Sequence, residues 1–493
     1  MRKHLSLASL FLTIFLLQIA SADELMQVPA AIHIASNVSD GKYSIAEIAS
    51  IAKENKIQVL IITDHALMRW QYGLWPFRNI VKRTVEQKSV FKYGIRHYLE
   101  AIKKAQASNP DIVLIPGIEA APFYYWTGSI FDQSLKIHNW HKHLLVIGLE
   151  KASDYEQLPV IGNEKGLRKP SGMKNVFNVF LSGLAVFSGI LLLGKRKFSY
   201  RDSGRHRLRP HGASGRIYGF AFIIAGALFL WNGYPFYDIA FDQYHGDKGA
   251  VPYQNLIDNA NHKGALTFWS HPEAPYVATV DNIGIATPGY ASDLEYTDNY
   301  TGFAVFYEGY NEIGFPGGLW DDILNEYCEG RRKSAVWAMA GLSFESEGDL
   351  EACLKDLRTV LLVYRLSSSE ALKALREGRM YVVRGKSSSQ FILDSFMVRD
   401  EARNVAKTMG EELATQEKPL IEISGRFLGG QDEVLNIKLI RSGSVIQTFE
   451  VRSPFHIFYT DDIDNKPGRR YYRVEINSPS LALVSNPIFV KHR

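Results

Sequence analysis

The 493-residue chain contains only two cysteines, Cys328 and Cys353. They form no CxxC motif, so they do not indicate a zinc site. In an oxidising compartment the two thiols could pair, and they could equally remain two buried thiols. The chain also lacks a glycine-rich phosphate loop and a GxSxG nucleophile elbow, so neither a P-loop nucleotide hydrolase nor a serine hydrolase of that type is indicated.

A strong positive charge is missing from most of the chain. The formal net charge is +4, but Arg2, Lys3 and the stretch 195–216 together carry +9, which leaves −5 for the rest. A protein that binds a phosphate backbone needs its positive charge on one folded face. We therefore expect no nucleic-acid partner.

The N-terminus has the pattern of an export signal. Basic residues at positions 2–4 precede an apolar run over 5–19 and the small residues Ala20-Ser21-Ala22. This order predicts a signal peptide over residues 1–22, with an uncleaved anchor as the alternative.

Two further apolar segments, 175–194 and 217–237, contain no charged residue. Each is long enough to span a membrane, although a pair of buried core helices has the same composition. The connection 195–216 carries eight Lys or Arg against one Asp, as cytoplasmic loops do. We predict a transmembrane hairpin over 171–240 in the inner (cytoplasmic) membrane, with the main domain and both termini extracytoplasmic, in the periplasm.

The remaining sequence alternates helix and strand patterns on both sides of the hairpin. Helices are expected over 44–55 and 95–107, and strands over 59–62, 112–115, 265–269, 303–307 and 335–339. Such alternation indicates an α/β unit with parallel strands. After about residue 388 the chain turns to short alternating strands, such as 420–427, 434–440 and 471–476, which predict a β-sandwich. The expected domains are 23–170 and 241–387 for the two parts of the α/β unit and 388–493 for the sandwich.

Polar residues follow several of these strands directly. Strand 59–62 runs into Thr63-Asp64-His65, strand 112–115 into Gly117-Ile118-Glu119, and strand 266–269 into Ser270-His271. The carboxyl ends of parallel strands carry the site in barrels of this kind. Imidazoles and a carboxylate at such ends are the ligands expected for zinc, manganese or iron.

Strand 143–149 begins with a histidine instead. If it returns antiparallel beside the strand that ends at Glu119, it places His143 next to Glu119. His138 and His141 precede it and are spare ligand candidates, but residues of such a polar loop are more often solvated.

The order of these motifs resembles the PHP (polymerase and histidinol phosphatase) superfamily. His33, Ser39-Asp40-Gly41, Thr63-Asp64-His65, Gly117-Ile118-Glu119, His143 and His271-Pro272 follow one another as in that superfamily. The stretches 374–382 (ALREGRMYV) and 485–488 (SNPI) are similar to the exported, carbaryl-hydrolase-like branch, in which a small β domain follows the catalytic one.

The resemblance implies a distorted (β/α)7 barrel that holds up to three divalent metal ions. The ligand positions that it implies are His33, Asp40, His65, Glu119, His143, His271 and Glu345. Glu119 would bridge two ions, while Asp64 and His65 would act at the catalytic centre, Asp64 by orienting the ligands. Zinc is the first expectation for the metal, with manganese and iron as alternatives.

The sequence departs from the superfamily pattern in two places. The opening His-x-His is His33-Ile34-Ala35, and the late Asp-x-His is Ser343-Phe344-Glu345. Alanine cannot bind a metal and serine is a poor ligand, whereas Glu345 can supply an oxygen. Three protein ligands and a water suffice for a hydrolytic zinc site, so the pattern predicts a partly degenerate but usable centre.

These observations predict a membrane-anchored, extracytoplasmic, metal-dependent hydrolase, either a phosphoesterase or a carbamate or ester hydrolase. Its substrate would be a small molecule, with an anionic one favoured by the phosphoesterase reading. Glu308 and Asn311 follow a strand and are candidates for substrate binding, although a capped turn explains them equally well. The alternative is a catalytically inactive PHP scaffold that binds a ligand or protein in the envelope.

Overall fold

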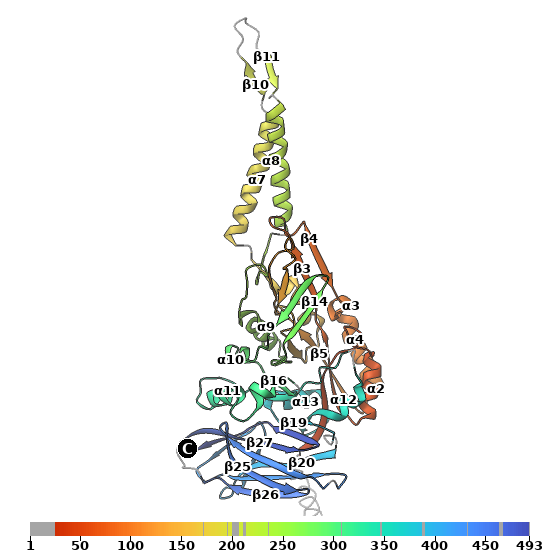
Figure 1. The fold of residues 1–493 in the computed structure, drawn as a ribbon, viewed down its shortest axis with the longest axis vertical. Helices are drawn as coiled ribbons and strands as arrows, with labels where there is room; N and C mark the ends of the chain where they lie inside the picture. Colours follow the sequence, from red (N-terminus) through yellow and green to blue (C-terminus); the bar gives the residue numbers. More distant parts are fainter. Residues whose placement is uncertain are drawn as a thin grey trace, which may run out of the picture.

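The computed structural model describes residues 25–170, 172–194, 196–199, 207–210, 213–234, 236–306, 308–345, 348–386, 390–430, 432–462 and 467–492. The predicted signal peptide over residues 1–22 lies outside them. Figure 1 shows a long molecule with a helical hairpin at one end, a mixed α/β body in the middle and a sheet-rich C-terminal region at the other end.

Seven strands of the body lie side by side in one sheet. Their order is β17-β16-β13-β8-β5-β2-β1. Their bounds are β1 Met26–Ile34, β2 Val59–His65, β5 Val113–Ala120, β8 Leu144–Ile147, β13 Leu266–Trp269, β16 Gly302–Phe306 and β17 Trp337–Ala340. All neighbouring pairs are parallel except those of β8, which runs antiparallel to both β5 and β13. The predicted α/β unit is confirmed.

The two edges of this seven-strand set approach each other. After β17 the chain returns to β1, where Leu342 N donates to Ile32 O over 2.9 Å and Phe344 N donates to His33 O over 3.2 Å. Residues Ile34 and Phe344 form an isolated bridge. The described strands nevertheless form no closed sheet, so the predicted barrel stays a prediction.

Helices pack their apolar faces against this sheet. In α2 (Ile45–Glu54) the buried positions are Ile45, Ile48, Ala49 and Ala52, the spacing of one helical face. Its N-terminus has a capping box in which Ser44 and Glu47 bond each other's backbone N–H. The other helices of the body are α3 Val90–Tyr93, α4 Ile95–Ser108, α5 Ala152–Glu156, α6 Glu164–Leu167, α9 Val251–His262, α10 Asp293–Tyr296, α11 Leu319–Cys328, α12 Leu350–Asp356 and α13 Ser368–Glu377, with a π-helical turn η1 at Tyr310–Gly314.

Two small sheets extend the body toward the helical end of the molecule (Figure 1). One is the hairpin of β3 Arg69–Gly73 and β4 Lys82–Glu86, and the other is a four-strand sheet in the order β14-β15-β7-β6. The bounds of these four are β6 Tyr125–Thr127, β7 Lys136–His138, β14 Tyr276–Val280 and β15 Ile283–Thr287. A cluster of buried aromatic and aliphatic side chains, among them Trp70, Trp126 and Ile137, holds the two sheets together.

The helical hairpin consists of α7 Met173–Gly194 and α8 Ala213–Gly233, with the short strands β10 Arg196–Ser199 and β11 Arg207–Pro210 between them. Both helices are long and apolar enough to cross a membrane, and only 11% of each apolar window is buried. Since these helices are exposed, they are not core helices of the body (Figure 1). At the base of the hairpin, β9 Arg168–Lys169 pairs with β12 Asp238–Ile239.

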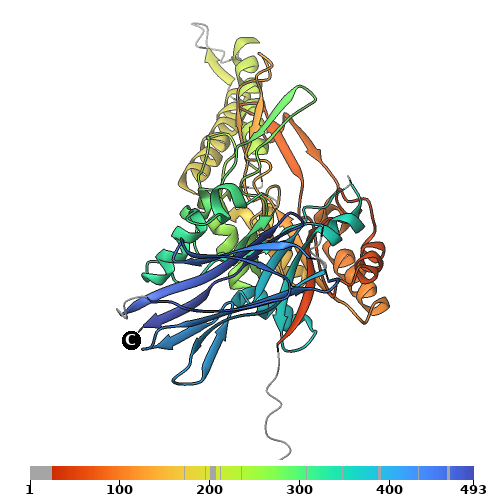
Figure 2. The ribbon, with the colours of Figure 1, turned by 60° about the horizontal axis from the view of Figure 1, so that its bottom comes forward.

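The C-terminal region packs two sheets face to face, as Figure 2 shows from the side of these strands. One sheet has the order β21-β20-β23-β26, and the other continues from β1 through β18 and β19 to β28, β27, β24 and β25, with β29 beside β27 and β22. A buried cluster joins Phe396 and Ile423 of the first sheet to Leu439 and Val474 of the second. The bounds are β18 Leu357–Val363, β19 Met380–Arg384, β20 Phe391–Asp400, β21 Val405–Thr408, β22 Glu412–Thr415, β23 Leu420–Phe427, β24 Val434–Arg441, β25 Ser444–Arg452, β26 Phe455–Thr460, β27 Gly468–Ser478, β28 Leu481–Ser485 and β29 Ile488–His492.

A buried ion cluster joins this region to the body. Arg473 on β27 donates through Nε to Asp321 Oδ1 on α11 over 2.8 Å, and through Nη1 to Glu475 Oε1 over 2.8 Å.

The two cysteines, Cys328 and Cys353, are free thiols, so they do not form the disulfide that the sequence left open.

Candidate metal centre

Glu119 lies at the centre of a cluster of histidines. It is the second-last residue of β5, whose apolar positions are buried, and its side chain is only 5% exposed. Four imidazole nitrogens lie within 3.4 Å of its two carboxylate oxygens: His33 Nε2 at 3.2 Å, His65 Nδ1 at 3.4 Å, His143 Nδ1 at 2.9 Å and His271 Nε2 at 3.3 Å. Strand ends far apart in the sequence thus deliver one carboxylate and four imidazoles to one point.

The antiparallel return of β8 brings His143 to Glu119. Glu119 pairs with Leu145 and Ala120 with Leu144, so His143 lies immediately beyond the end of β5. The predicted position of His143 beside Glu119 is confirmed.

His33 reaches the cluster through an irregularity of β1. The register between β1 and β2 shifts between Ile32 and Ile34, and His33 has a φ of 70°. A non-glycine residue with positive φ is strained and is held only where the surroundings demand it. This backbone turn directs the His33 ring to Glu119.

Both ring nitrogens of His143 face an oxygen that can only accept. His143 Nε2 lies 3.1 Å from the carbonyl oxygen of Trp140, and His143 Nδ1 lies 2.9 Å from Oε1 of the Glu119 carboxylate. Burial lowers the pKa of His143 to about 4 against the opposing effect of Glu119, so the ring is neutral near pH 7. A neutral ring carries one N–H, so when Nε2 donates to Trp140 O, the Nδ1 lone pair faces the Glu119 carboxylate at 2.9 Å.

Two electron-rich atoms at this distance repel each other unless a cation lies beside them. His33 Nδ1 and His65 Nδ1 are also buried and have no hydrogen-bond partner. Glu119 stays ionised, because His33, His143 and His65 outweigh burial and hold its pKa well below the usual range. The donor set of buried imidazoles and an ionised carboxylate therefore fits a divalent metal ion, whose binding would displace protons from the imidazoles.

The ligand atoms fall into groups that could each hold one ion. His65 belongs to one group with Glu119 and His143, and to another with Asp40 and Glu345; within each group the ligand atoms lie within 4.8 Å of one another. His65 Nε2 lies 3.0 Å from Asp40 Oδ2. Burial alone would lower the pKa of His65, but Glu119 and Asp40 raise it to about 9. Burial, with Asp40 and Glu119 nearby, raises the pKa of Glu345.

His141, one of the two spare ligand candidates, lies beside the cluster and is only partly exposed. Its ligand nitrogen lies within 4.8 Å of those of His143 and His271, and its ring stacks on Tyr276 at 4.0 Å. His141 lies two residues before His143, in the turn that leads into β8. His138 instead stacks on Tyr125 in the neighbouring hairpin sheet.

Asp64 does not face the cluster. It is fully buried and accepts hydrogen bonds from Ser36 N and Ser36 Oγ, each at 2.8 Å, and from Ser39 N at 3.1 Å and Ser39 Oγ at 2.7 Å. Asp64 thus holds the turn that presents Asp40. This matches an orienting residue rather than one that touches the substrate.

The two positions that depart from the superfamily pattern lie beside the cluster. Ala35 is buried and its backbone N donates to Phe344 O over 2.9 Å, while Ser343 is exposed with a φ of 51°.

The side chains of the two substrate-binding candidates, Glu308 and Asn311, are exposed. Backbone N–H groups of Asn311, Glu312 and Ile313 donate to the Glu273 carboxylate, two residues after His271. Substrate binding by Glu308 and Asn311 stays a prediction.

Comparison with known proteins agrees with this centre. Residues 31–169 match the family model of the PHP domain, a range that includes all the cluster residues from His33 to His143. No curated protein matches the chain.

Three solved structures are similar at 11% sequence identity. A two-domain protein from Bacteroides vulgatus containing a predicted PHP-like metal-dependent phosphoesterase covers 94% of this chain and 97% of its own, with a TM-score of 0.36. A candidate metal-dependent phosphoesterase from Bifidobacterium adolescentis covers 65% and 89%, with a TM-score of 0.25. An amidohydrolase from Chromobacterium violaceum covers 65% and 88%, also with a TM-score of 0.25.

The family match and the geometry of the centre point the same way. Residues 31–169 are therefore similar to the PHP domain, and the chain has a cluster of histidine and glutamate side chains suited to a divalent metal.

Proposed function

We propose that this protein is a metal-dependent hydrolase, with phosphoesters as its first substrate class and carbamates or esters as the second. The observation that carries the proposal is the convergence of four imidazole nitrogens within 3.4 Å of the Glu119 carboxylate. Buried polar groups arranged in this way are costly to a fold unless they hold a ligand. Zinc fits the imidazole-rich donor set best, with manganese or iron as alternatives.

Two ion positions follow from the groups of ligand atoms. Glu119, His143, His271 and His141 would hold one ion, and Asp40, His65 and Glu345 would hold the other. A third position, which the superfamily pattern would place at His33, Ala35 and Ser343, lacks two of its side chains. A divalent ion bound in such a centre polarises a phosphoryl or carbonyl oxygen and lowers the pKa of a bound water.

The chain's own residues supply order around these ions. The Trp140 carbonyl would accept from His143 Nε2 and leave Nδ1 for an ion, and Tyr290 Oη lies 3.0 Å from His271 Nδ1, which keeps His271 Nε2 directed at Glu119. Asp64 secures the turn that carries Asp40. These contacts hold the ligands in place before a substrate arrives.

The proposal includes the location of the enzyme. The exposed apolar helices α7 and α8 would anchor it in the inner membrane, with the basic connection between them in the cytoplasm and the catalytic body outside. The predicted signal peptide over residues 1–22 agrees with this orientation, because it would place the start of the body outside the cytoplasm. A reporter that works only in the cytoplasm should be active when fused into residues 195–216. If a reporter that works only outside the cytoplasm is active there, this topology is overturned.

The fold of the catalytic part would be the distorted seven-strand barrel of the PHP superfamily. The hydrogen bonds of Leu342 and Phe344 to β1 support this proposal, because they join the two edges of the seven-strand set. The domain bounds 23–170, 241–387 and 388–493 are part of the same proposal.

An inactive scaffold that binds an envelope ligand or protein is the second candidate. The absence of ligand side chains at Ala35 and Ser343 favours it. The enzyme is preferred because loss of catalysis would release all ligand positions from selection, whereas Glu119, His143 and His271 remain together.

The first experiment is the elemental metal content of the purified full-length chain beside Glu119→Ala and His271→Ala. We expect zinc, manganese or iron in stoichiometric amount in the wild type and its loss in both variants. Hydrolysis of phosphoesters, carbamates and esters is then assayed with the metal-loaded protein. Failure of the wild type to bind any divalent metal would sink the hydrolase proposal.

A further inference from the structure

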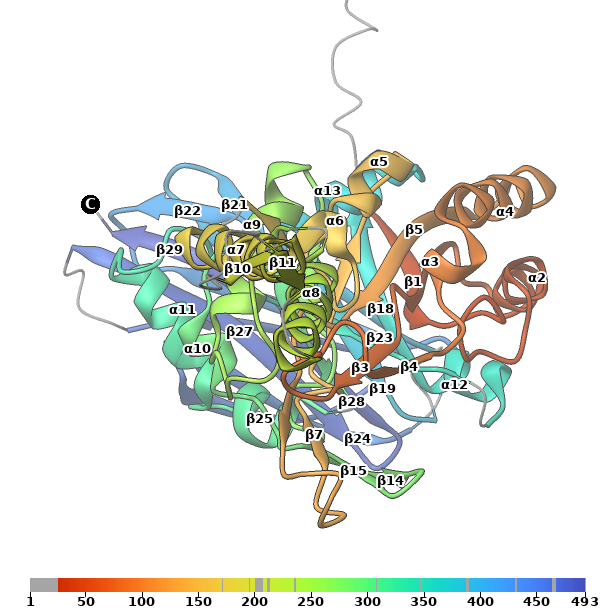
Figure 3. The same cartoon turned by 90° about the horizontal axis from the view of Figure 1, so that it is seen from above.

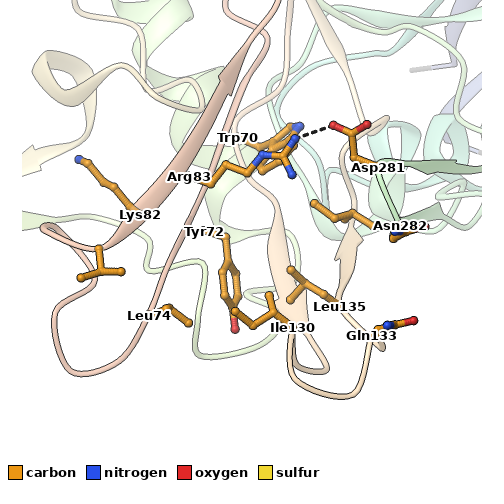
Figure 4. A pocket seen from close by; sticks show the side chains of 12 residues that line it. Trp70, Tyr72, Leu74, Lys82, Arg83, Ile130, Gln133, Leu135, Asp281 and Asn282 are labelled. Carbon is orange, nitrogen blue, oxygen red and sulfur yellow. Dashed lines mark hydrogen bonds and ion pairs between the residues drawn. The ribbon is translucent and has the colours of Figure 1, made fainter.

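We propose that the substrate is an amphiphile drawn from the membrane, with its acyl chain held in a cavity beside the metal centre. This inference rests on the proposed function, because the polar group of the same molecule would reach the metal ions. The cavity has a volume of about 470 Å³, within the range of roughly 300–1,000 Å³ typical of small-molecule sites. Most of its lining is apolar, and Trp70, Tyr72, Leu74, Ile130 and Leu135 point into it (Figure 4).

Three insertions build the cavity, and each follows a residue of the metal centre in the chain. The hairpin β3–β4 follows His65, the segment β6–β7 follows Glu119, and the hairpin β14–β15 follows His271. The cavity walls come from all three, through residues 70–83, 130–135 and 281–283. The same loops that leave the metal centre therefore enclose the apolar space.

The distance between the metal centre and the cavity suits a substrate with an alkyl chain. Tyr276, the first residue of β14, stacks on His141 at the metal centre, and Asp281, in the turn that follows β14, borders the cavity. Five residues of strand span at most about 17 Å. A polar head at the metal ions and an alkyl tail in the cavity could thus belong to one molecule.

The insertions expose large apolar side chains at their tips. Trp75 and Phe131, from the first two insertions, are 79% and 86% exposed, and Val280, which ends β14 beside the turn of the third, is 47% exposed. Val81 and Ile130 beside them are also exposed. Single exposed apolar residues are ordinary, but one group on three adjacent tips indicates an apolar contact surface.

This surface continues the predicted transmembrane hairpin. Asn79 N donates to Asn232 Oδ1 over 3.0 Å near the end of α8, and Asn79 Nδ2 donates to Asn232 O over 2.7 Å. The Phe77 ring packs on Phe229 of α8 with a centroid distance of 5.2 Å. Figure 3, seen along the helices, shows α8 end-on beside β3 and β4. A bilayer that contains α7 and α8 would therefore meet the insertion tips.

The charge of the first tip fits a lipid surface. Residues 76–83 contain Arg78, Lys82 and Arg83 and no acidic residue. Basic and aromatic side chains together are typical of segments at the headgroup level of anionic lipids. Arg83 also pairs with Asp281 across the cavity, above the Trp70 ring, so this ion pair ties two of the insertions together (Figure 4).

The test uses the full-length chain in lipid nanodiscs that contain phosphatidic acid with a photoactivatable acyl chain. After illumination, labelled peptides are identified by mass spectrometry. We expect labels on 70–83, 130–135 and 281–283 in addition to α7 and α8. The double variant Val81→Asp with Ile130→Asp places charge in the cavity at exposed positions and should reduce cavity labelling at least tenfold. Val445→Asp, equally exposed on the distant strand β25, should leave it unchanged.

Labels confined to α7 and α8, or equal labelling in the double variant and the wild type, would overturn the inference. Repeating the experiment with Glu119→Ala separates it from the proposed function, since the acyl chain should still label the cavity without the metal centre. If the wild type binds metal and hydrolyses a soluble phosphoester but shows no cavity labelling, the proposed function stands and the proposal of a membrane-derived substrate fails.

Discussion

His141 lies where its imidazole could be an additional ligand of the metal centre. Its nitrogen lies within 4.8 Å of the ligand nitrogens of His143 and His271, and burial with the influence of both neighbours lowers its pKa to about 2. It is therefore neutral near pH 7 and available as a ligand. His138, three residues earlier, bonds Thr127 and stays outside the cluster.

His141→Ala should weaken metal binding about tenfold or more, which corresponds to about 1.4 kcal/mol. The measurement is a titration of the purified protein against a competing chelator. His138→Ala is the matched control, and we expect its affinity to equal that of the wild type. Equal affinities in all three proteins would show that His141 does not bind the ion.

Asp64 stabilises the turn between β1 and α2. It accepts four hydrogen bonds from Ser36 and Ser39 in a fully buried position. Asp64→Ala would leave the buried Ser36 N–H without its acceptor, at a cost of about 1–3 kcal/mol, and would also remove the acceptor of the Ser36 and Ser39 hydroxyls, whereas Ser39 N keeps its bond to Ser36 O. We expect the free energy of unfolding to fall by about 3 kcal/mol in urea denaturation. A decrease within the error of the measurement would contradict this role.

Strand β23 carries a carboxylate whose ionisation stabilises the C-terminal region. Glu422 lies between β20 and β26, where Arg399 Nη2 is at 2.6 Å and His456 Nε2 at 3.2 Å. Burial would raise the pKa of Glu422, but Arg399 and then His456 outweigh it and lower the pKa. A carboxyl with a lower pKa in the folded state stabilises the fold above its unfolded pKa of about 4.5, and this contribution is lost as the pH falls through the folded value.

Glu422→Gln should therefore lower the urea midpoint at pH 7, and the difference from the wild type should shrink as the pH falls below about 4.5. Denaturation curves at a series of pH values give the measurement. Glu450→Gln on the exposed edge strand β25 is the control and should show no such trend. A difference that stays constant with pH would show that Glu422 does not act through its charge.

The helical hairpin joins the rest of the molecule through a narrow base. Arg168 pairs with Ile239 and Lys169 with Asp238, and Gly172 N donates to Asp238 Oδ2 over 2.7 Å. The two ends of the hairpin are thus already adjacent. Its exposed apolar helices have no favourable environment in water.

A chain in which residues 173–234 are replaced by a short Gly/Ser linker should be soluble without detergent and should keep its metal ions. Ultracentrifugation and elemental analysis, compared with the full-length chain, provide the measurement. Retained solubility with loss of metal would show that the hairpin contributes to the metal centre. Aggregation of the shortened chain would contradict a role limited to anchoring.

Much of the fold and of the centre could be predicted from local patterns. The buried runs that end at His65, Glu119 and His271 are apolar in sequence, and the structure has strands at each of them. The antiparallel return at His143 followed from one strand pattern. Which of the spare candidates His138 and His141 lies beside the cluster could not be decided from the sequence, because it does not show how their loop folds. The Asp64 carboxylate faces Ser36 and Ser39 because a turn distant from it in sequence packs there.

The sequence by itself determined the α/β alternation, the apolar hairpin and the types of ligand at the strand ends, because burial and periodicity act over a few neighbouring residues. Only the tertiary structure decided which ligands converge on Glu119 and that three insertions enclose a cavity beside them. Such contacts join residues far apart in the chain, and their geometry depends on strand register and on the turn of β1 at His33. No local pattern contains that register.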